Sequence, residues 1–324
     1  MHTFRFAPLL LLVACGSSET PAPAPVDAGV PETGRAAGVE EIAKIDNVAV
    51  DGLVADSDAL FVISGGGTGR GAIARVAKSG GAAQEIASSI TLDASFQIAV
   101  DGTHVYWGDH SSHAVERAPK GGGPKENVFT FDANHDPSFV AVRDGALYVQ
   151  FKTGSGVEKV AMQGGQREKL YEGSTASPCG IRFDATTMFA CSRSEIVARP
   201  LDGMGVTPVY KRVKFDVRGF AVDDAALVVS VGVDVCNTSS VFRVAKSGGA
   251  GDPITTGCGT SEIAAGGGTV FLGLSPGGVV SAGAKATTYD ATANRPRIAI
   301  DSQAVYFSSY DETSGVSTIW HAPR

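Results

Sequence analysis

Short apolar runs recur along most of the chain, and turns rich in glycine, aspartate and serine separate them. Each run is roughly five to eight residues long and contains many β-branched and aromatic residues, as in Val105-Tyr106-Trp107. A helix would need a longer stretch in which apolar residues recur with a period near 3.6. The pattern therefore predicts an all-β protein built from many short strands.

These strands belong to one unit that recurs seven times, and the unit consists of an apolar strand, a turn, an aromatic or β-branched strand and a third strand before a glycine-rich turn. The first halves begin at Leu53, Ile98, Val140, Ile181, Phe220, Ile263 and Ile298. The aligned turn positions are Asp56, Asp101, Arg143, Asp184, Asp223, Gly266 and Asp301, at intervals of 45, 42, 41, 39, 43 and 35 residues. Such intervals are typical of one four-stranded propeller blade.

The two ends of the repeat region complement each other. The seventh unit stops at Trp320 to Arg324, before a fourth strand, whereas Val39 to Ala43 resembles the fourth strand Ala83 to Ala87 of the first unit. We therefore expect residues 39–324 to form a seven-bladed β-propeller of four-stranded antiparallel blades. The N-terminal strand would complete the last blade and leave no long exposed edge.

The N-terminal residues read as an export signal. Arg5 precedes an apolar run from Phe6 to Val13, which is too short to span a bilayer. The run ends in Leu12-Val13-Ala14-Cys15, which resembles the bacterial lipobox and implies a signal peptide over residues 1–14 and a lipidated Cys15. The alternative is ordinary cleavage near Ala14, with Cys15 an incidental thiol.

Residues 15–38 would then carry the lipid and act as a spacer. Four prolines lie here among small residues, and such a composition favours a flexible tether. Gly16 follows the cysteine in place of an aspartate, and in the lipoprotein family this implies the outer membrane rather than inner-membrane retention. The predicted protein is lipid-anchored to the bacterial cell envelope through Cys15.

One local motif connects the repeat to known propellers. Tyr106-Trp107-Gly108-Asp109, followed by Arg117 to Gly122, resembles the repeat of YWTD and NHL type (TolB-like) propellers. The resemblance covers the general repeat pattern and implies the fold, but fold alone does not establish function.

Composition and charge narrow the classes of partner. The formal net charge is −7 with no cluster of lysine and arginine, which argues against nucleic-acid binding. We expect a monomer whose loop face binds a protein or a glycan.

Four cysteines remain beyond Cys15, and export favours their pairing. Cys179 and Cys191 flank a symmetric hairpin, while Cys236 and Cys258 lie in two loops of the fifth unit, so two disulfides are predicted. A zinc site is the alternative, although no closely spaced Cys or His pair supports it.

A basic residue occupies one third-strand position in most units. A ring of these cations could bind an acidic ligand, or their stems could pack between blades with their heads paired to the turn aspartates. We expect the second arrangement. The residues are Arg75, Arg117, Lys159, Arg199, Arg243 and His321.

The loops of the second blade carry the richest set of candidate functional side chains. They are Asp109, His110, His113, His135 and Asp136, together with Asp132 and Asn134. Imidazoles and carboxylates of this kind can bind a divalent metal or transfer protons, whereas solvated loop polars would be the structural alternative. No cofactor other than such a metal is indicated.

Three functions remain open. The first is a non-enzymatic binding module of the cell envelope, and the second is an enzyme resembling propeller lyases or lactonases that uses these loop residues. The third is a structural envelope protein. The binding module is the favoured hypothesis.

Overall fold

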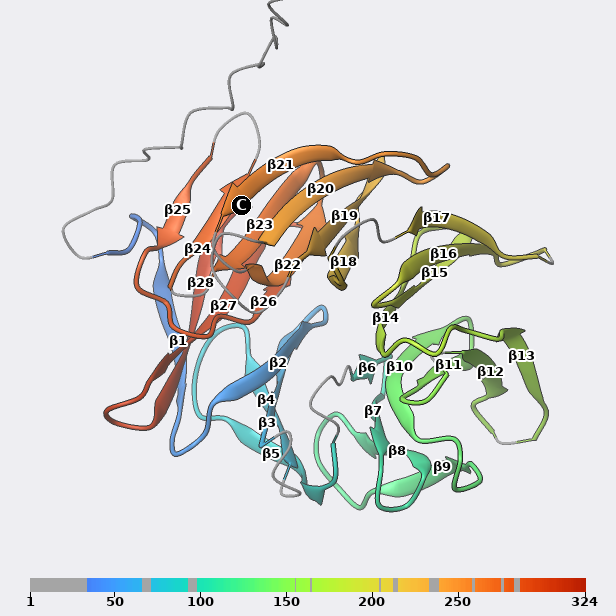
Figure 1. Ribbon diagram of the computed structural model, residues 1–324. Coiled ribbons are helices and arrows are strands. Elements are labelled where there is room, and N and C mark those ends of the chain that lie inside the picture. Colours follow the sequence, from blue (N-terminus) through green and yellow to red (C-terminus); the bar gives the residue numbers. More distant parts are fainter. Residues whose placement is uncertain are drawn as a thin grey trace, which may run out of the picture.

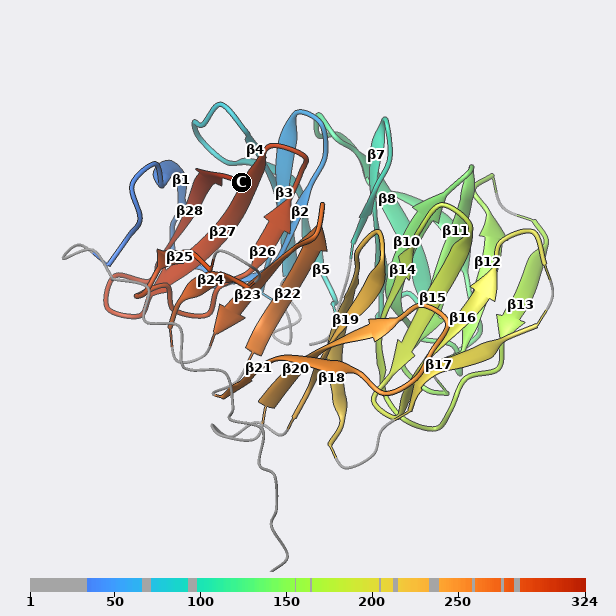
Figure 2. The ribbon, with the colours of Figure 1, turned by 90° about the horizontal axis from the view of Figure 1, so that it is seen from above.

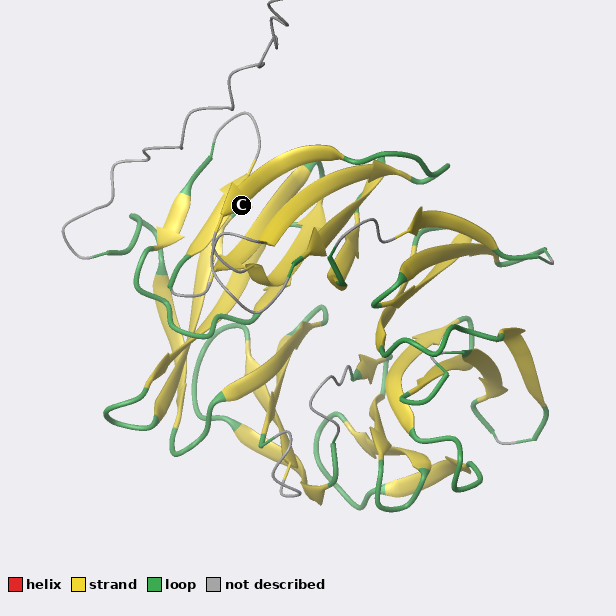
Figure 3. Cartoon of the chain, viewed as in Figure 1, coloured by secondary structure: helices red, strands yellow, loops and turns green. Residues whose placement is uncertain are grey.

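The computed structural model describes residues 34–65, 71–92, 98–154, 156–163, 165–203, 205–211, 215–232, 239–257, 260–274, 277–282 and 286–324. Every regular element in these ranges is a β-strand (Figure 3). They form seven four-stranded antiparallel sheets around a common centre (Figure 1). No described segment is a helix long and apolar enough to cross a membrane.

The first three blades cover the N-terminal half of the ring. Blade 1 contains β2 (Val50–Ala55), β3 (Ala59–Ser64), β4 (Gly71–Ala77) and β5 (Gln84–Ile90). Blade 2 contains β6 (Ala99–Val100), β7 (His104–Asp109), β8 (Ala114–Pro119) and β9 (Glu126–Thr130). Blade 3 contains β10 (Pro137–Arg143), β11 (Ala146–Phe151), β12 (Val157–Ala161) and β13 (Arg167–Tyr171).

The remaining four blades complete the ring. Blade 4 contains β14 (Pro178–Phe183), β15 (Thr187–Ser192), β16 (Glu195–Pro200) and β17 (Thr207–Lys211). Blade 5 contains β18 (Val217–Val222), β19 (Ala226–Val231), β20 (Ser239–Ala245) and β21 (Asp252–Gly257). Blade 6 contains β22 (Thr260–Gly266), β23 (Thr269–Leu274), β24 (Val279–Ala282) and β25 (Thr288–Asp290). Blade 7 contains β26 (Ile298–Ile300), β27 (Ala304–Asp311), β28 (Val316–Pro323) and β1 (Glu40–Ile45).

The two ends of the described chain meet in blade 7. Strand β1 pairs antiparallel with β28, with Glu40 opposite His321 and Ile45 opposite Ser317 (Figure 2). Ahead of β1, Arg35 donates from Nε to the Asp290 carboxylate at 2.7 Å, and its guanidinium lies over the Trp320 ring. The last residues of the predicted tether therefore lie against blades 6 and 7.

The core consists of seven apolar clusters, each between two neighbouring blades. Phe61 and Ile73 of blade 1 pack with Val105 and Trp107 of blade 2, and the other interfaces repeat this arrangement. A sheet with apolar residues on both faces is stable only when both faces are covered. This explains why the strands are nearly continuous apolar runs.

The recurring turn aspartates cap their own turns. Asp56 accepts hydrogen bonds at Oδ1 from the amides of Asp58 and Ala59 at 2.7 and 2.8 Å, and Asp301 repeats the pattern. A short carboxylate that satisfies the turn amides favours this geometry. Aspartate therefore recurs at this position because it stabilises the turn between the first and second strands of the blade.

The predicted pairing of third-strand bases with turn aspartates is confirmed for one unit and wrong for the units of Arg117, Arg199 and His321. Arg243 does pair with Asp223 at 3.3 Å, but Arg117 pairs with Glu126 at 2.9 Å and His321 faces Glu40 at 3.9 Å. The reason is register, because both Arg117 and His321 are directly opposite those fourth-strand acids. Cross-strand neighbours are closer than a turn beyond the strand end.

A different lysine reaches the turn aspartates, and it comes from the next blade. Lys78 of blade 1 contacts Asp301 of blade 7 at 2.6 Å, and Lys246 of blade 5 contacts Asp184 of blade 4 at 2.8 Å. Lys120 of blade 2 pairs in the same way with Asp56 of blade 1. These ion pairs, here called interblade latches, join adjacent blades at the turns between their first and second strands.

The latches predict a pH-dependent contribution to stability. Burial by itself would raise the pKa of Asp184, but Lys246 and the turn amides outweigh it and lower that pKa below its ordinary value. A lowered folded pKa gives stability that is present above about pH 4 and is lost as pH falls through the folded value. Lys246→Met is expected to lower the free energy of unfolding by about 1 kcal/mol at neutral pH.

Urea unfolding at pH 7 and at about pH 2 checks this, because the difference from the wild type is expected to shrink at the lower pH. The exposed Lys211 at the end of β17 provides the matched control, Lys211→Met. A Lys246→Met effect that is equal at both pH values would contradict the latch.

Candidate functional site

The structure places Asp109 at the end of β7, where the strand enters the β7–β8 loop. Its side chain is buried, and its carboxylate accepts hydrogen bonds from the amides of Thr91 at 2.8 Å and Ser111 at 2.9 Å. Burial by itself would raise its pKa, yet hydrogen bonds from the Ser111 hydroxyl and from backbone amides lower it. A carboxylate held in this way stabilises the β7–β8 loop.

The histidines of the same loops form separate pairs. His113 Nδ1 contacts the Asp136 carboxylate, and His135 Nδ1 contacts Asp132 at 2.7 Å. The backbone amide of His110 donates to Thr91. Within the described residues, no group of three or more His, Cys, Asp or Glu is arranged to hold a metal ion. A ligand or metal role for these loops stays a prediction.

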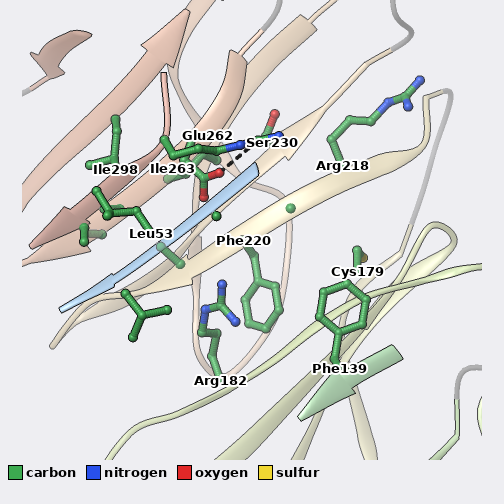
Figure 4. A pocket seen from close by; sticks show the side chains of 18 of the residues that line it. Leu53, Phe139, Cys179, Arg182, Arg218, Phe220, Ser230, Glu262, Ile263 and Ile298 are labelled. Atoms are coloured by element: carbon green, nitrogen blue, oxygen red, sulfur yellow. Dashed lines mark hydrogen bonds and ion pairs between the residues drawn. The ribbon is translucent and has the colours of Figure 1, made fainter. Parts of the chain in front are cut away.

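A cavity of about 560 Å³ lies where the innermost strands of the blades converge (Figure 4). Four arginines and two acids border it, although the chain as a whole is acidic. The predicted blade-two loop residues are not among its lining. The charged residues are Arg182, Arg193, Arg218, Arg297, Asp51 and Glu262.

Repeated bulges shape the entrance. In five blades the register between the first and second strands shifts near the start of the first strand, for example between Val217 and Gly219. A bulge re-aims side chains at a barrel or channel rim. Here Asp51, Cys179 and Arg218 occupy the extra position and line the cavity.

The charged centre of the cavity joins blades 4, 6 and 7. Arg297 Nη1 donates to Glu262 Oε2 at 3.3 Å, and Figure 4 shows Arg182 pointing toward the same carboxylate. The Arg297 and Glu262 side chains are 30% and 29% exposed, so solvent reaches them through the cavity. Burial raises the pKa of Glu262, and the two guanidinium groups oppose that rise.

Two buried polar atoms on the cavity wall have no hydrogen-bond partner among the described residues. They are Nε of Arg297 and Oγ of Ser230, and Ser230 is only 2% exposed. Gly219 of β18 is the cross-strand partner of Ser230 of β19, and a Cβ added at Gly219 would meet no atom within 4 Å. The cavity is thus open at Gly219, beside these two buried atoms.

Apolar surface accompanies these polar groups. Phe139, Phe220 and Ile263 line the cavity, and the Arg182 guanidinium lies 6.0 Å from the centre of the Phe220 ring. Figure 4 shows Arg218 directed away from this cluster, and its Nε donates to the Gly232 carbonyl at 2.9 Å. Arg182, Arg297 and Glu262 therefore form the central charged group.

A signal for this site is present in the repeat. Arg182 follows the residue paired with Ala190, and the equivalent position in the other units is held by Val54, Ala99, Ala141, Ala221, Ala264 and Ala299. The other blades fill this position with a small apolar residue, so packing between blades does not explain the long, charged side chain of Arg182. Aligning the units column by column would have identified it.

Cys179 and Cys191 form the predicted disulfide, with their Cα atoms 5.0 Å apart. The bond joins the bulge of β14 to the buried second strand β15 beside the cavity. Cys236 and Cys258 lie outside the described residues.

No protein-family model matches this chain, and no curated protein sequence matches it. Solved structures do. The inactive virginiamycin B lyase from Staphylococcus aureus with quinupristin has a TM-score of 0.68 at 13% identity, covering 88% of this chain and 98% of that one. YCF48 bound to D1 peptide has a TM-score of 0.62 at 8% identity, covering 87% and 94%.

BamB from Moraxella catarrhalis has a TM-score of 0.53 at 11% identity and covers 87% of this chain and 99% of that one. At such low identities the comparisons establish the fold alone. The chain is a seven-bladed β-propeller.

Proposed function

We propose that this propeller is a binding module of the bacterial cell envelope, anchored by a lipid on Cys15, which takes a protein partner at the mouth of its central cavity. The observation that carries the proposal is the solvent-accessible cavity that holds Arg182, Arg297 and Glu262 at fixed positions. Concave sites with a few polar groups on an apolar wall are typical of ligand binding.

The fold comparisons support this class of function without identifying the partner. YCF48 is recorded bound to D1 peptide, and the lyase with quinupristin, so propellers of this shape accept ligands. BamB is another protein of this shape. Cys15 and the spacer of residues 15–38 would hold the propeller near the outer membrane.

The experiment is affinity capture from the native envelope with the tethered protein. Gly219→Leu fills the cavity without touching an arginine, since the glycine has open space around it and its φ is not in the left-handed region. Gly102→Leu is the matched control, because Gly102 has equally open space in the turn after β6, at the opposite end of the inner strands.

A specific protein partner is expected with the wild type and with Gly102→Leu, and at least tenfold less of it with Gly219→Leu. Equal recovery with both leucine variants would refute binding at the cavity.

Cys15→Ser is expected to release the protein from the membrane fraction, and retention there would refute the lipid anchor. His113→Ala with Asp136→Ala tests whether the blade-two loops take part in the same surface.

A further inference from the structure

We infer that the central cavity binds an organic carboxylate carried on an apolar group, with Arg182 and Arg297 as its anion-binding residues and Glu262 as an internal competitor. This inference rests on the proposed binding function and adds the chemistry of the ligand. The cavity volume of about 560 Å³ lies within the range of small-molecule sites, about 300–1,000 Å³.

The charge balance of the cavity favours an anion. Two guanidinium groups approach one carboxylate at the centre, which leaves an excess positive charge there. At the rim the charges are balanced, because Arg193 faces Asp216 at 3.8 Å and Arg218 is offset by Asp51. Arginine remains charged even when burial lowers its pKa, as burial does for Arg182. A second carboxylate would complete the neutralisation of this cluster.

Hydrogen-bonding geometry points to the same ligand. The Arg297 fork uses Nη1 for Glu262 while its Nε has no partner among the described residues, and Ser230 Oγ is also unpartnered. A buried donor without an acceptor is unfavourable, and a carboxylate bound to the Arg297 guanidinium would offer Nε an acceptor. Planar carboxylates suit a guanidinium fork because they accept two parallel hydrogen bonds.

The apolar part of the ligand follows from the apolar residues of the lining. Phe139, Phe220 and Ile263 line the cavity beside the charged residues, with Phe220 next to Arg182 and Ile263 next to Glu262, and offer no hydrogen bonds from their side chains. Inorganic phosphate or acetate would accept hydrogen bonds from the arginines but leave this apolar surface exposed to water. A carboxylate attached to an aromatic or aliphatic group would cover it.

The test measures binding by isothermal titration calorimetry with phenylacetate, acetate, inorganic phosphate and an acetylated tripeptide that ends in phenylalanine with a free carboxylate. Phenylacetate is expected to bind with a Kd near or below about 1 mM and at least tenfold more tightly than acetate or phosphate. The tripeptide, compared with its amidated form, distinguishes a chain end from a small free acid as the source of the carboxylate.

Substitutions of the charged residues test the role of each in ligand binding. Arg182→Gln and Arg297→Gln are each expected to weaken phenylacetate binding by about tenfold or more, because each removes a charge-assisted hydrogen bond. Glu262→Gln is expected to tighten binding several-fold, since it removes the competing carboxylate. Arg117→Gln, on the third strand of blade 2 and paired with Glu126, is the control and is expected to change nothing.

Gly219→Leu keeps the test decisive if an arginine variant fails to fold, because it fills the cavity and leaves every charge in place. Loss of phenylacetate binding with this variant supports the inference. Equal affinity for phosphate and phenylacetate, or weaker binding by Glu262→Gln, would overturn it. If no carboxylate binds while partner capture still depends on Gly219, the inference fails and the proposed function stands.

Discussion

Deleting residues 1–45 is expected to abolish cooperative folding of the propeller. The deletion removes β1, which supplies the fourth strand of blade 7 and pairs with β28 from Ser317 to His321. Ala43, 5% exposed, would also leave the cluster that contains Leu60 and Ile319. An uncovered blade edge exposes backbone groups and apolar surface together. Among the described strands, β1 is the one that comes from the N-terminal side and closes the ring.

Far-UV circular dichroism with thermal and urea unfolding measures this outcome. Deleting residues 1–33 keeps Arg35 and β1, and is expected to leave the midpoint within about 2 °C of the full chain. Arg35→Ala measures the contribution of the Arg35–Asp290 contact separately from that of β1, because it leaves the fully buried Asp290 without this cation. We expect it to cost about 2 kcal/mol. A 1–45 deletion that melts like the wild type would disprove closure by β1.

Removing the Cys179–Cys191 disulfide is expected to lower the free energy of unfolding by about 2–3 kcal/mol. The bond closes a loop with a sequence separation of 12 residues, and such a crosslink limits the unfolded chain. In a domain of this size that corresponds to a fall in Tm of about 5 °C or more. Differential scanning calorimetry of Cys179→Ala/Cys191→Ala checks the size of the effect.

The reductant dithiothreitol provides the internal control for this prediction. It is expected to destabilise the wild type by a similar amount, and the double variant much less. Any response that the double variant retains would report on the second predicted bond, Cys236–Cys258. If the double variant melts at the wild-type temperature, the disulfide does not stabilise the fold.

The repeat explains why the architecture was predictable. Strand length, turn aspartates such as Asp56 and Asp301, and the spacing between units are local properties, and seven copies of the same pattern reinforce one another. The disulfide was predictable for a related reason, since Cys179 and Cys191 flank one hairpin and the hairpin register brings them together.

The ion pairs were less predictable because they depend on which blade lies beside which. Position along the third strand suggested that Arg117 would reach a turn aspartate, but its cross-strand neighbour Glu126 is nearer. Three of the turn aspartates instead pair with lysines of the next blade, as Asp184 does with Lys246, and this contact exists only when two blades are packed.

By itself, the sequence determined an all-β ring of seven units, because hydrophobic periodicity and turn chemistry act over a few residues and repeat along the chain. Only the tertiary structure decided where charge gathers. Arg182, Glu262 and Arg297 come from three different blades and meet in one cavity, whereas the blade-two histidines, close in sequence, form separate pairs. The physical reason is that ring closure, and not sequence spacing, sets the distances between inner strands.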